Sequence, residues 1–135
     1  MKNEEKKENL VERTILVVED EPALAEAVSI KLKKEGFKCL LAFSGEEGLQ
    51  ILKKEKPDLI WLDLLMPGMG GFAFLEKVRQ QPKWRDLPVV IVSVSGSPEK
   101  IRRAFELNVI DYLQKSQYRL GDIVGNVREF LEKRK

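Results

Sequence analysis

The amino-acid sequence predicts an α/β fold in which a five-stranded parallel sheet carries helices on both of its faces. Two observations support this class. Three short runs are apolar at every position, and segments with helical spacing separate these runs from one another and from two weaker runs. Strands that are covered on both faces form continuous apolar runs. Strict alternation of strands with helices favours parallel pairing.

The three apolar runs are expected to be the central strands; they are residues 15–18, 59–62 and 89–92. The two weaker runs mix polar with apolar residues, which is typical of strands at the edges of a sheet. They are residues 38–42 and 109–113. Among doubly wound folds, this arrangement corresponds to the strand order 2-1-3-4-5. Ligands are then expected beyond the carboxyl ends of the first and third strands, where the order reverses.

The first two intervals between strands carry clear helix boundaries. Pro22 is tolerated in the first turn of a helix, and Gly36 is placed to end that helix. Between them, apolar residues recur at four-residue spacing: Leu24, Val28 and Leu32. Ser44 and Glu47 have the spacing of a capping box, and Pro57 prevents the second helix from continuing.

The remaining intervals predict three more helices. One follows the glycine pair at 70 and 71 and is lined by Phe74, Leu75 and Val78. Another runs from Ser97-Pro98 to Asn108, which can adopt the left-handed conformation that closes a helix. Its inward-facing residues are expected to be Ile101, Ala104 and Phe105. Residues 120–134 form the last helix, although Gly121 and Gly125 lower its helix propensity.

Length and composition favour one compact domain. The chain has 135 residues, of which 43% are hydrophobic. Lysine and arginine number 24 against 22 acidic residues, and a net charge of +2 does not favour a nucleic-acid or membrane partner. No apolar run approaches the roughly 18 residues of a membrane helix, so a cytoplasmic protein is expected. Residues 1–12 are expected to be a charged N-terminal extension, and residues 13–135 to form the domain.

Acidic residues follow the first and third strands, where the strand order reverses. Glu19, Asp20 and Glu21 come directly after the first strand, and Asp63 comes directly after the third. Like charges that lie close together require a cation to offset them, so the convergence of three of these acids predicts a hard divalent metal. Mg²⁺ binds one or two protein carboxylates and completes its shell with waters and phosphate oxygens.

Polar residues also end the other two strands on that side of the sheet. Ser93 closes the fourth strand, and Lys115 follows the fifth. A metal, a hydroxyl and an ammonium around one carboxylate are the groups that neutralise a phosphoryl group in transfer. The sequence therefore predicts that Asp63 accepts a phosphoryl group.

Four segments resemble the signatures of response-regulator receiver domains, the phosphoacceptor domains of two-component signalling that include chemotaxis regulators. The segments are residues 15–22, 58–71, 88–93 and 111–115, and they occur in the order found in the family. The resemblance covers roughly residues 13–133. It implies a flavodoxin-like fold and a single receiver domain over residues 13–135.

The resemblance also implies a metal site. Asp63 would be the phosphoacceptor, and Glu19 and Asp20 would be the acidic pair that holds Mg²⁺ or Mn²⁺ together with it. The backbone carbonyl of Leu65 would complete the protein ligands. Glu19 replaces the commoner aspartate but keeps a carboxylate, and Leu65 replaces a frequent asparagine where only the carbonyl is needed.

Three further residues match the family's switch. Ser93 and Lys115 would contact the phosphoryl oxygens, and Tyr112 would change rotamer together with Ser93 on activation. Val94 stands where a smaller residue is usual, which would narrow access to the acceptor. Ser116 replaces the proline that normally follows the lysine, so we expect a trans Lys115-Ser116 bond, with Lys115 still within reach of Asp63.

The function implied is a phosphorylation-dependent switch of a two-component system. The chain would receive its phosphoryl group from a histidine kinase or a histidine phosphotransfer protein. It would assist its own phosphorylation and dephosphorylation without being an enzyme for a separate substrate. The output would be protein contact through the fourth helix, the fifth strand and the fifth helix. Because no DNA-binding module follows residue 135, no direct contact with nucleic acid or membrane is expected.

Other proteins with related folds match less well. A dinucleotide-binding enzyme or an FMN carrier needs glycines in the turn after the first strand, where residues 19–22 are anionic. A phosphatase with an aspartyl nucleophile normally has a second acid where Leu65 stands. The remaining alternative is a degenerate receiver that binds proteins without turning over phosphate. The presence of four site residues argues against it: Asp20, Asp63, Ser93 and Lys115.

Overall fold

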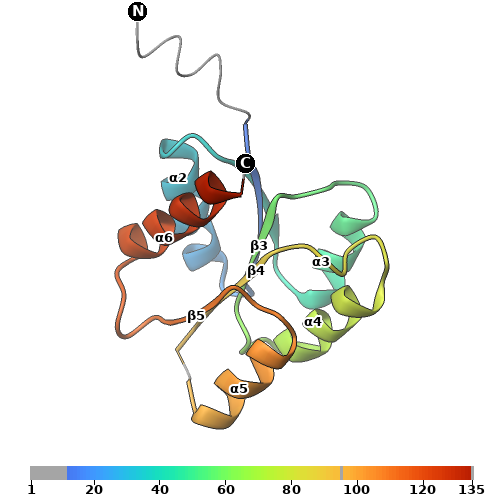
Figure 1. Ribbon diagram of the computed structural model, residues 1–135. Coiled ribbons are helices and arrows are strands. Elements are labelled where there is room, and N and C mark those ends of the chain that lie inside the picture. Colours follow the sequence, from blue (N-terminus) through green and yellow to red (C-terminus); the bar gives the residue numbers. More distant parts are fainter. Residues whose placement is uncertain (1–11, 95, 135) are drawn as a thin grey trace, which may run out of the picture.

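The computed structural model describes residues 12–94 and 96–134, in which strands and helices alternate (Figure 1). The strands are β1 (Thr14–Val18), β2 (Lys38–Ala42), β3 (Leu59–Leu62), β4 (Val89–Ser93) and β5 (Asp111–Gln114). The helices are α2 (Pro22–Lys34), α3 (Gly45–Leu52), α4 (Gly70–Gln80), α5 (Pro98–Glu106) and α6 (Leu120–Lys133). The expected N-terminal extension lies outside the described residues except for Glu12. Among the helices described, none is both long enough and apolar enough to cross a membrane.

The five strands form one parallel sheet in the order β2-β1-β3-β4-β5, which confirms the predicted fold class and strand order. In the register, Val18 at the end of β1 is aligned with Ala42 of β2 and with Leu62 of β3. At the other side, Ser93 of β4 is aligned with Gln114 of β5. The loops that follow β1 and β3 therefore leave the sheet at the same edge.

Two apolar clusters lie on opposite faces of the sheet. Leu16 and Val18 of β1 belong to the cluster under α3, α4 and α5, whereas Ile15 and Val17 belong to the cluster under α2 and α6. Figure 1 shows these two groups of helices on opposite sides of the strands. Because successive side chains of a strand point to opposite faces, a strand covered on both sides is apolar throughout. This arrangement explains the continuous apolar runs in the sequence.

Local hydrogen bonds set several helix ends as the sequence predicts. The Glu47 backbone N–H donates to Ser44 Oγ at 3.0 Å, so Ser44 caps α3. The Glu47 carboxylate in turn accepts from the Phe43 N–H at 2.9 Å, one residue earlier than in the standard capping box. Asn108 closes α5 with a φ of 59°, in the left-handed region.

The structure differs from two of the sequence predictions around α5. Phe105 is 45% exposed, not inward-facing. Neighbouring helical residues point about 100° apart, so the burial of Ala104 against the sheet turns Phe105 outward. The last strand begins at Asp111 and not at Val109. Val109 still takes part in the helix ending, because its N–H donates to the Ala104 carbonyl at 3.4 Å.

Arg79 of α4 fastens the loop that leads into β4. Its guanidinium donates to the carbonyl oxygens of Leu107 and Leu87, each at 2.7 Å, and of Arg85 at 2.9 Å. Burial lowers the pKa of this guanidinium, and the charge of Asp86 opposes that effect. One side chain thus ties α4 both to the loop before β4 and to the end of α5.

We predict opposite effects on stability from two glycine substitutions. A Cβ on Gly71 would lie 2.5 Å from the Leu64 Cα and 2.7 Å from the carbonyl oxygen of Asp63. Gly71→Ala is therefore expected to lower the free energy of unfolding by about 1–3 kcal/mol. Gly125 of α6 has open space around it, so Gly125→Ala is expected to raise stability by roughly 0.5–1 kcal/mol. Urea unfolding measures both changes, and a Gly71→Ala protein as stable as wild type would contradict the close contact.

Candidate functional site

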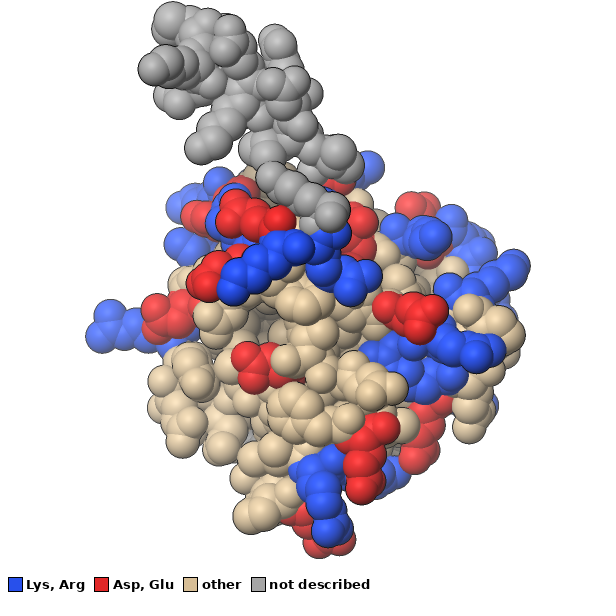
Figure 2. Space-filling view, viewed as in Figure 1, with Lys and Arg blue, Asp and Glu red and all other residues tan. Residues whose placement is uncertain are grey.

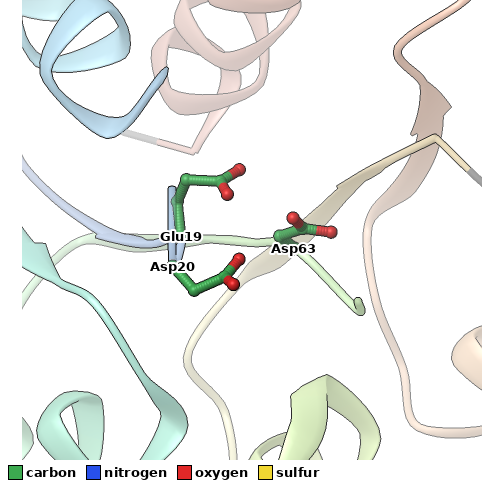
Figure 3. Close-up of side chains that lie close together, drawn as sticks. All are labelled: Glu19, Asp20 and Asp63. Carbon is green, nitrogen blue, oxygen red and sulfur yellow. The ribbon is translucent and has the colours of Figure 1, made fainter. Parts of the chain in front are cut away.

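Three carboxylates meet at the carboxyl edge of the sheet. Glu19 and Asp20 follow β1 and Asp63 follows β3, and one carboxylate oxygen of each lies within 4.8 Å of those of the other two. Figure 3 shows Glu19 and Asp20 directed toward the side of the sheet where Asp63 lies. Glu19 is 2% exposed and Asp63 is 5% exposed, whereas Asp20 is partly open to solvent. The structure thus brings together the three acids that the sequence singled out.

Lys115, which follows the edge strand β5, contacts two of these acids. Its Nζ donates to Glu19 Oε1 at 3.0 Å and to Asp63 Oδ2 at 3.4 Å. The backbone N–H of Lys115 donates to the Ser93 carbonyl at 2.8 Å, which anchors the lysine beside β4. The described part of the chain contains no cis peptide bond, so the bond between Lys115 and Ser116 is trans as expected. Lys115 reaches Asp63 with this geometry.

Backbone amides hold the second oxygen of each buried carboxylate. The Leu65 N–H donates to Asp63 Oδ1 at 3.0 Å, and the Glu21 N–H donates to Glu19 Oε2 at 3.2 Å. Each carboxylate therefore has one oxygen on the backbone and one facing the Lys115 ammonium. These contacts fix the orientation of both side chains.

The electrostatics of the site reflect burial and crowding. Burial raises the pKa of Glu19 and the charge of Asp63 adds to the increase, while the Lys115 and Glu21 hydrogen bonds oppose it. For Lys115, burial alone would lower the pKa. The hydrogen bond to Glu19 and the charges of Asp63 and Glu19 outweigh burial, so the pKa of Lys115 is raised. The ammonium is stabilised in its charged form by its carboxylate partners.

The donor set fits a hard divalent cation. Three carboxylates face one ammonium, so the formal charges leave two negative charges at the cluster. Carboxylate oxygens are the ligands that Mg²⁺ and Mn²⁺ prefer, and these ions accept a site of few protein ligands completed by water.

Ser93 and Tyr112 lie next to the acidic cluster. Ser93 ends β4 and is fully buried, and Tyr112 of the neighbouring β5 is 9% exposed. Burial raises the pKa of the Tyr112 hydroxyl, a hydrogen bond with Ser93 opposes the increase, and the charge of Asp63 adds to it. The Ser93 and Tyr112 side chains are thus in contact, and Asp63 lies close enough for its charge to act on the Tyr112 hydroxyl. Val94, which follows Ser93, is exposed.

The sequence of this chain matches the family model described as the response regulator receiver domain over residues 15–128. This chain belongs to the response regulator receiver domain family. Receiver domains of this family are phosphoacceptors of two-component systems.

Curated relatives are similar to this receiver domain over part of their length. The chain is 30% identical over 119 residues to the DNA-binding dual master transcriptional regulator RpaA of Synechocystis sp., covering 88% of this chain and 49% of that protein. It is 36% identical over 103 residues to the phosphate regulon transcriptional regulatory protein PhoB of Escherichia coli, covering 76% and 45%. The chain spans about half the length of these curated relatives.

Solved structures resemble this receiver domain over nearly their whole length. A putative response regulator from Chloroflexus aurantiacus has a TM-score of 0.81 at 32% identity, covering 90% of this chain and 99% of that one. The phosphorylated cyanobacterial phytochrome response regulator RcpA has a TM-score of 0.79 at 28% identity, covering 89% and 94%. The Mn²⁺-bound form of the response regulator Rcp1 has a TM-score of 0.78 at 28% identity, covering 88% and 94%.

One contact of the receiver site was not predicted from the sequence. Lys115 was expected to reach Asp63, but its shorter contact is with Glu19. The two residues of that ion pair are 96 positions apart, and neither has a local pattern that indicates the other. A search for lysine or arginine residues that follow strands near the acidic point where the strand order reverses could have suggested the pair.

We predict that Lys115→Met destabilises the domain in buffer free of divalent cations. The substitution leaves Glu19 and Asp63 buried without a counter-charge, and the Lys115 side chain is only 21% exposed. A loss of about 1–3 kcal/mol in the free energy of unfolding is expected. Adding Glu19→Gln should recover part of the loss because it removes one of the two buried charges. Urea unfolding of the single and double variants tests this, and a single variant as stable as wild type would refute it.

Proposed function

We propose that this receiver domain, spanning residues 13–135, accepts a phosphoryl group on Asp63 from a histidine kinase or a histidine phosphotransfer protein. The observation that carries the proposal is the setting of Asp63. Its carboxylate is held by a backbone amide on one oxygen and faces Lys115 on the other, within 4.8 Å of two further acids. No other aspartate in the described part of the chain belongs to such a cluster, apart from Asp20.

A divalent cation, Mg²⁺ or Mn²⁺, completes the proposed site. Glu19, Asp20 and Asp63 would hold it together with the backbone carbonyl of Leu65. When bound, the cation supplies positive charge that stabilises the phosphoryl oxygens during transfer. The similar response regulator Rcp1 has been solved in an Mn²⁺-bound form, which supports a divalent cation as the occupant.

The residues of the chain account for the transfer itself. A carboxylate oxygen of Asp63 bonds to phosphorus while the bond from phosphorus to the donor imidazole nitrogen breaks, and the electron pair leaves with the imidazole. The Leu65 N–H keeps the carboxylate oriented, and the Lys115 ammonium offsets charge on the phosphoryl oxygens. Dephosphorylation is a separate reaction, in which water attacks phosphorus, the bond between phosphorus and the Asp63 oxygen breaks, inorganic phosphate leaves and the Asp63 carboxylate is regenerated. The similar response regulator RcpA has been solved in a phosphorylated form, which supports phosphorylation of this domain.

The output is proposed to be protein contact through the surface of α5, β5 and α6, which are the fourth helix, the fifth strand and the fifth helix of the domain. Ser93 ends β4 beside this surface and Tyr112 belongs to it, so a contact between the two connects the acceptor with the surface. Phe105 of α5 is 45% exposed and Tyr118 before α6 is 39% exposed, and both supply apolar area for a partner. Phosphorylation adds roughly 1.5 to 2 negative charges, which bias the Ser93 and Tyr112 arrangement.

The experiment that tests the proposal is phosphorylation by acetyl phosphate with Mg²⁺, read by intact mass. Wild type is expected to gain one phosphoryl group, and Asp63→Asn is expected to gain none. Asp86→Asn is the matched control, because it makes the same change at an exposed position outside the cluster, and it should react like wild type. A phosphoryl group on Asp63→Asn at the wild-type rate would refute the assignment.

We also predict that Ser93 and Tyr112 rearrange together in a beryllofluoride complex, which mimics the phosphorylated state. The Ser93 hydroxyl is expected to leave Tyr112 for the bound fluoride, and the Tyr112 ring is expected to move into the space that the serine leaves. A crystal structure of the complex checks both rotamers. Two side chains that keep the arrangement of the unmodified chain would contradict the predicted switch.

A further inference from the structure

A groove that the proposed function does not use runs along α3 and α4. It consists of two hollows of about 280 and 340 Å³ that share Lys53 and Trp84. The first lies between α3 and α4, and the second lies between residues 52–57 and residues 83–87. We call the two hollows together, with all the residues that line either of them, the Trp84 groove. Figure 1 shows α3 and α4 side by side, away from α2 and α6.

The floor of the Trp84 groove is apolar and anchored. Trp84 is partly buried and packs against the core cluster, and Leu52 and Leu87 beneath the second hollow belong to that cluster. The loop that carries Trp84 is held by Arg79, which donates to the carbonyl oxygens of Arg85 and Leu87. The groove is therefore a formed surface of the folded chain. An apolar floor with polar groups around it is the usual composition of a binding site.

The rim of the groove is basic. Five lysines line it against two glutamates, Glu46 and Glu55; the lysines are Lys53, Lys54, Lys56, Lys77 and Lys83. This local excess is larger than the net charge of +2 for the whole chain. In residues 12–94 and 96–134, none of the five lysines takes part in an ion pair. Figure 2 shows basic side chains on the side of the molecule where α3 and α4 lie.

We propose that the Trp84 groove binds an acidic peptide segment of a partner protein. Carboxylates of the segment meet the lysines of the rim, and an apolar side chain packs on Trp84 between the two hollows. A peptide fits better than a nucleic acid, because Glu46 and Glu55 interrupt the basic rim and would repel a continuous phosphate backbone. A single aromatic side chain also offers no series of stacking platforms.

None of the residues that line the groove belongs to the phosphoryl site. Residues 52–57 precede β3 and residues 83–87 precede β4, whereas Asp63 follows β3 and Ser93 ends β4. The second hollow therefore lies at the amino edge of the sheet, opposite the acidic cluster. Binding in the groove is expected to be the same in wild type and in Asp63→Asn, which distinguishes failure of this proposal from failure of the proposed function.

The test uses a capped octapeptide with the sequence Glu-Glu-Leu-Glu-Glu-Phe-Glu-Glu. Its binding is followed by the indole N–H signals in nitrogen-edited NMR spectra and by anisotropy of a labelled copy. The signal of Trp84 is expected to shift, while that of Trp61, which is 1% exposed, stays in place. Replacing the leucine and phenylalanine by glycine should weaken binding, because the apolar contact with Trp84 is lost.

Charge reversal identifies the surface. Lys53→Glu alters an exposed lysine shared by both hollows and is expected to raise the dissociation constant by roughly tenfold. Lys77→Glu, on the other side of the first hollow, should act in the same direction. Lys34→Glu makes the same charge change at an exposed position of α2 outside the groove and should change the constant by less than about twofold.

Three results would overturn the proposal. The first is the absence of any shift of the Trp84 signal with the peptide in excess. The second is an equal loss of affinity in Lys34→Glu and Lys53→Glu, which would show attraction by overall charge alone. The third is tighter binding of a single-stranded octanucleotide than of the peptide at the same salt concentration, which would identify a nucleic-acid surface in place of a peptide site.

Discussion

The electrostatic balance at the carboxyl edge of the sheet is the constraint on which the functional parts of this structure depend. Two buried carboxylates, Glu19 and Asp63, share one ammonium, and Asp20 adds a third negative charge. Lys115 offsets only part of this charge. The cluster therefore still attracts a cation, and a bound cation would in turn stabilise a phosphoryl group. The parallel sheet imposes the crowding, because β1 and β3 are neighbours that end at one edge.

Much of the fold could be predicted because burial on both faces leaves a direct mark in the sequence. The bounds of β2 and β3 agree with the predicted runs, and the convergence of Asp63 with Glu19 and Asp20 follows once the strand order is known. Contacts between distant side chains leave no such mark. The Lys115 to Glu19 ion pair and the Arg79 contacts with backbone carbonyls depend on loop geometry, which short-range patterns do not encode.

The two proposals place different tasks at the two edges of the sheet. At the carboxyl edge, rigid strands present Asp63 and Ser93, and Tyr112 continues the contact into β5. At the amino edge, Arg79 fixes the loop that carries Trp84 beside the lysines. A partner bound at the amino edge would leave the acceptor accessible to its phosphodonor.

The central claim is that Lys115 and a divalent cation neutralise the same carboxylates. Calorimetric titration of Mg²⁺ into wild type and Lys115→Met tests this directly, with Asp20→Ala as the control that removes a proposed ligand. If the claim holds, Lys115→Met binds Mg²⁺ more tightly than wild type, because the competing ammonium is gone, and Asp20→Ala binds it more weakly. Unchanged or weaker Mg²⁺ binding in Lys115→Met would contradict the account.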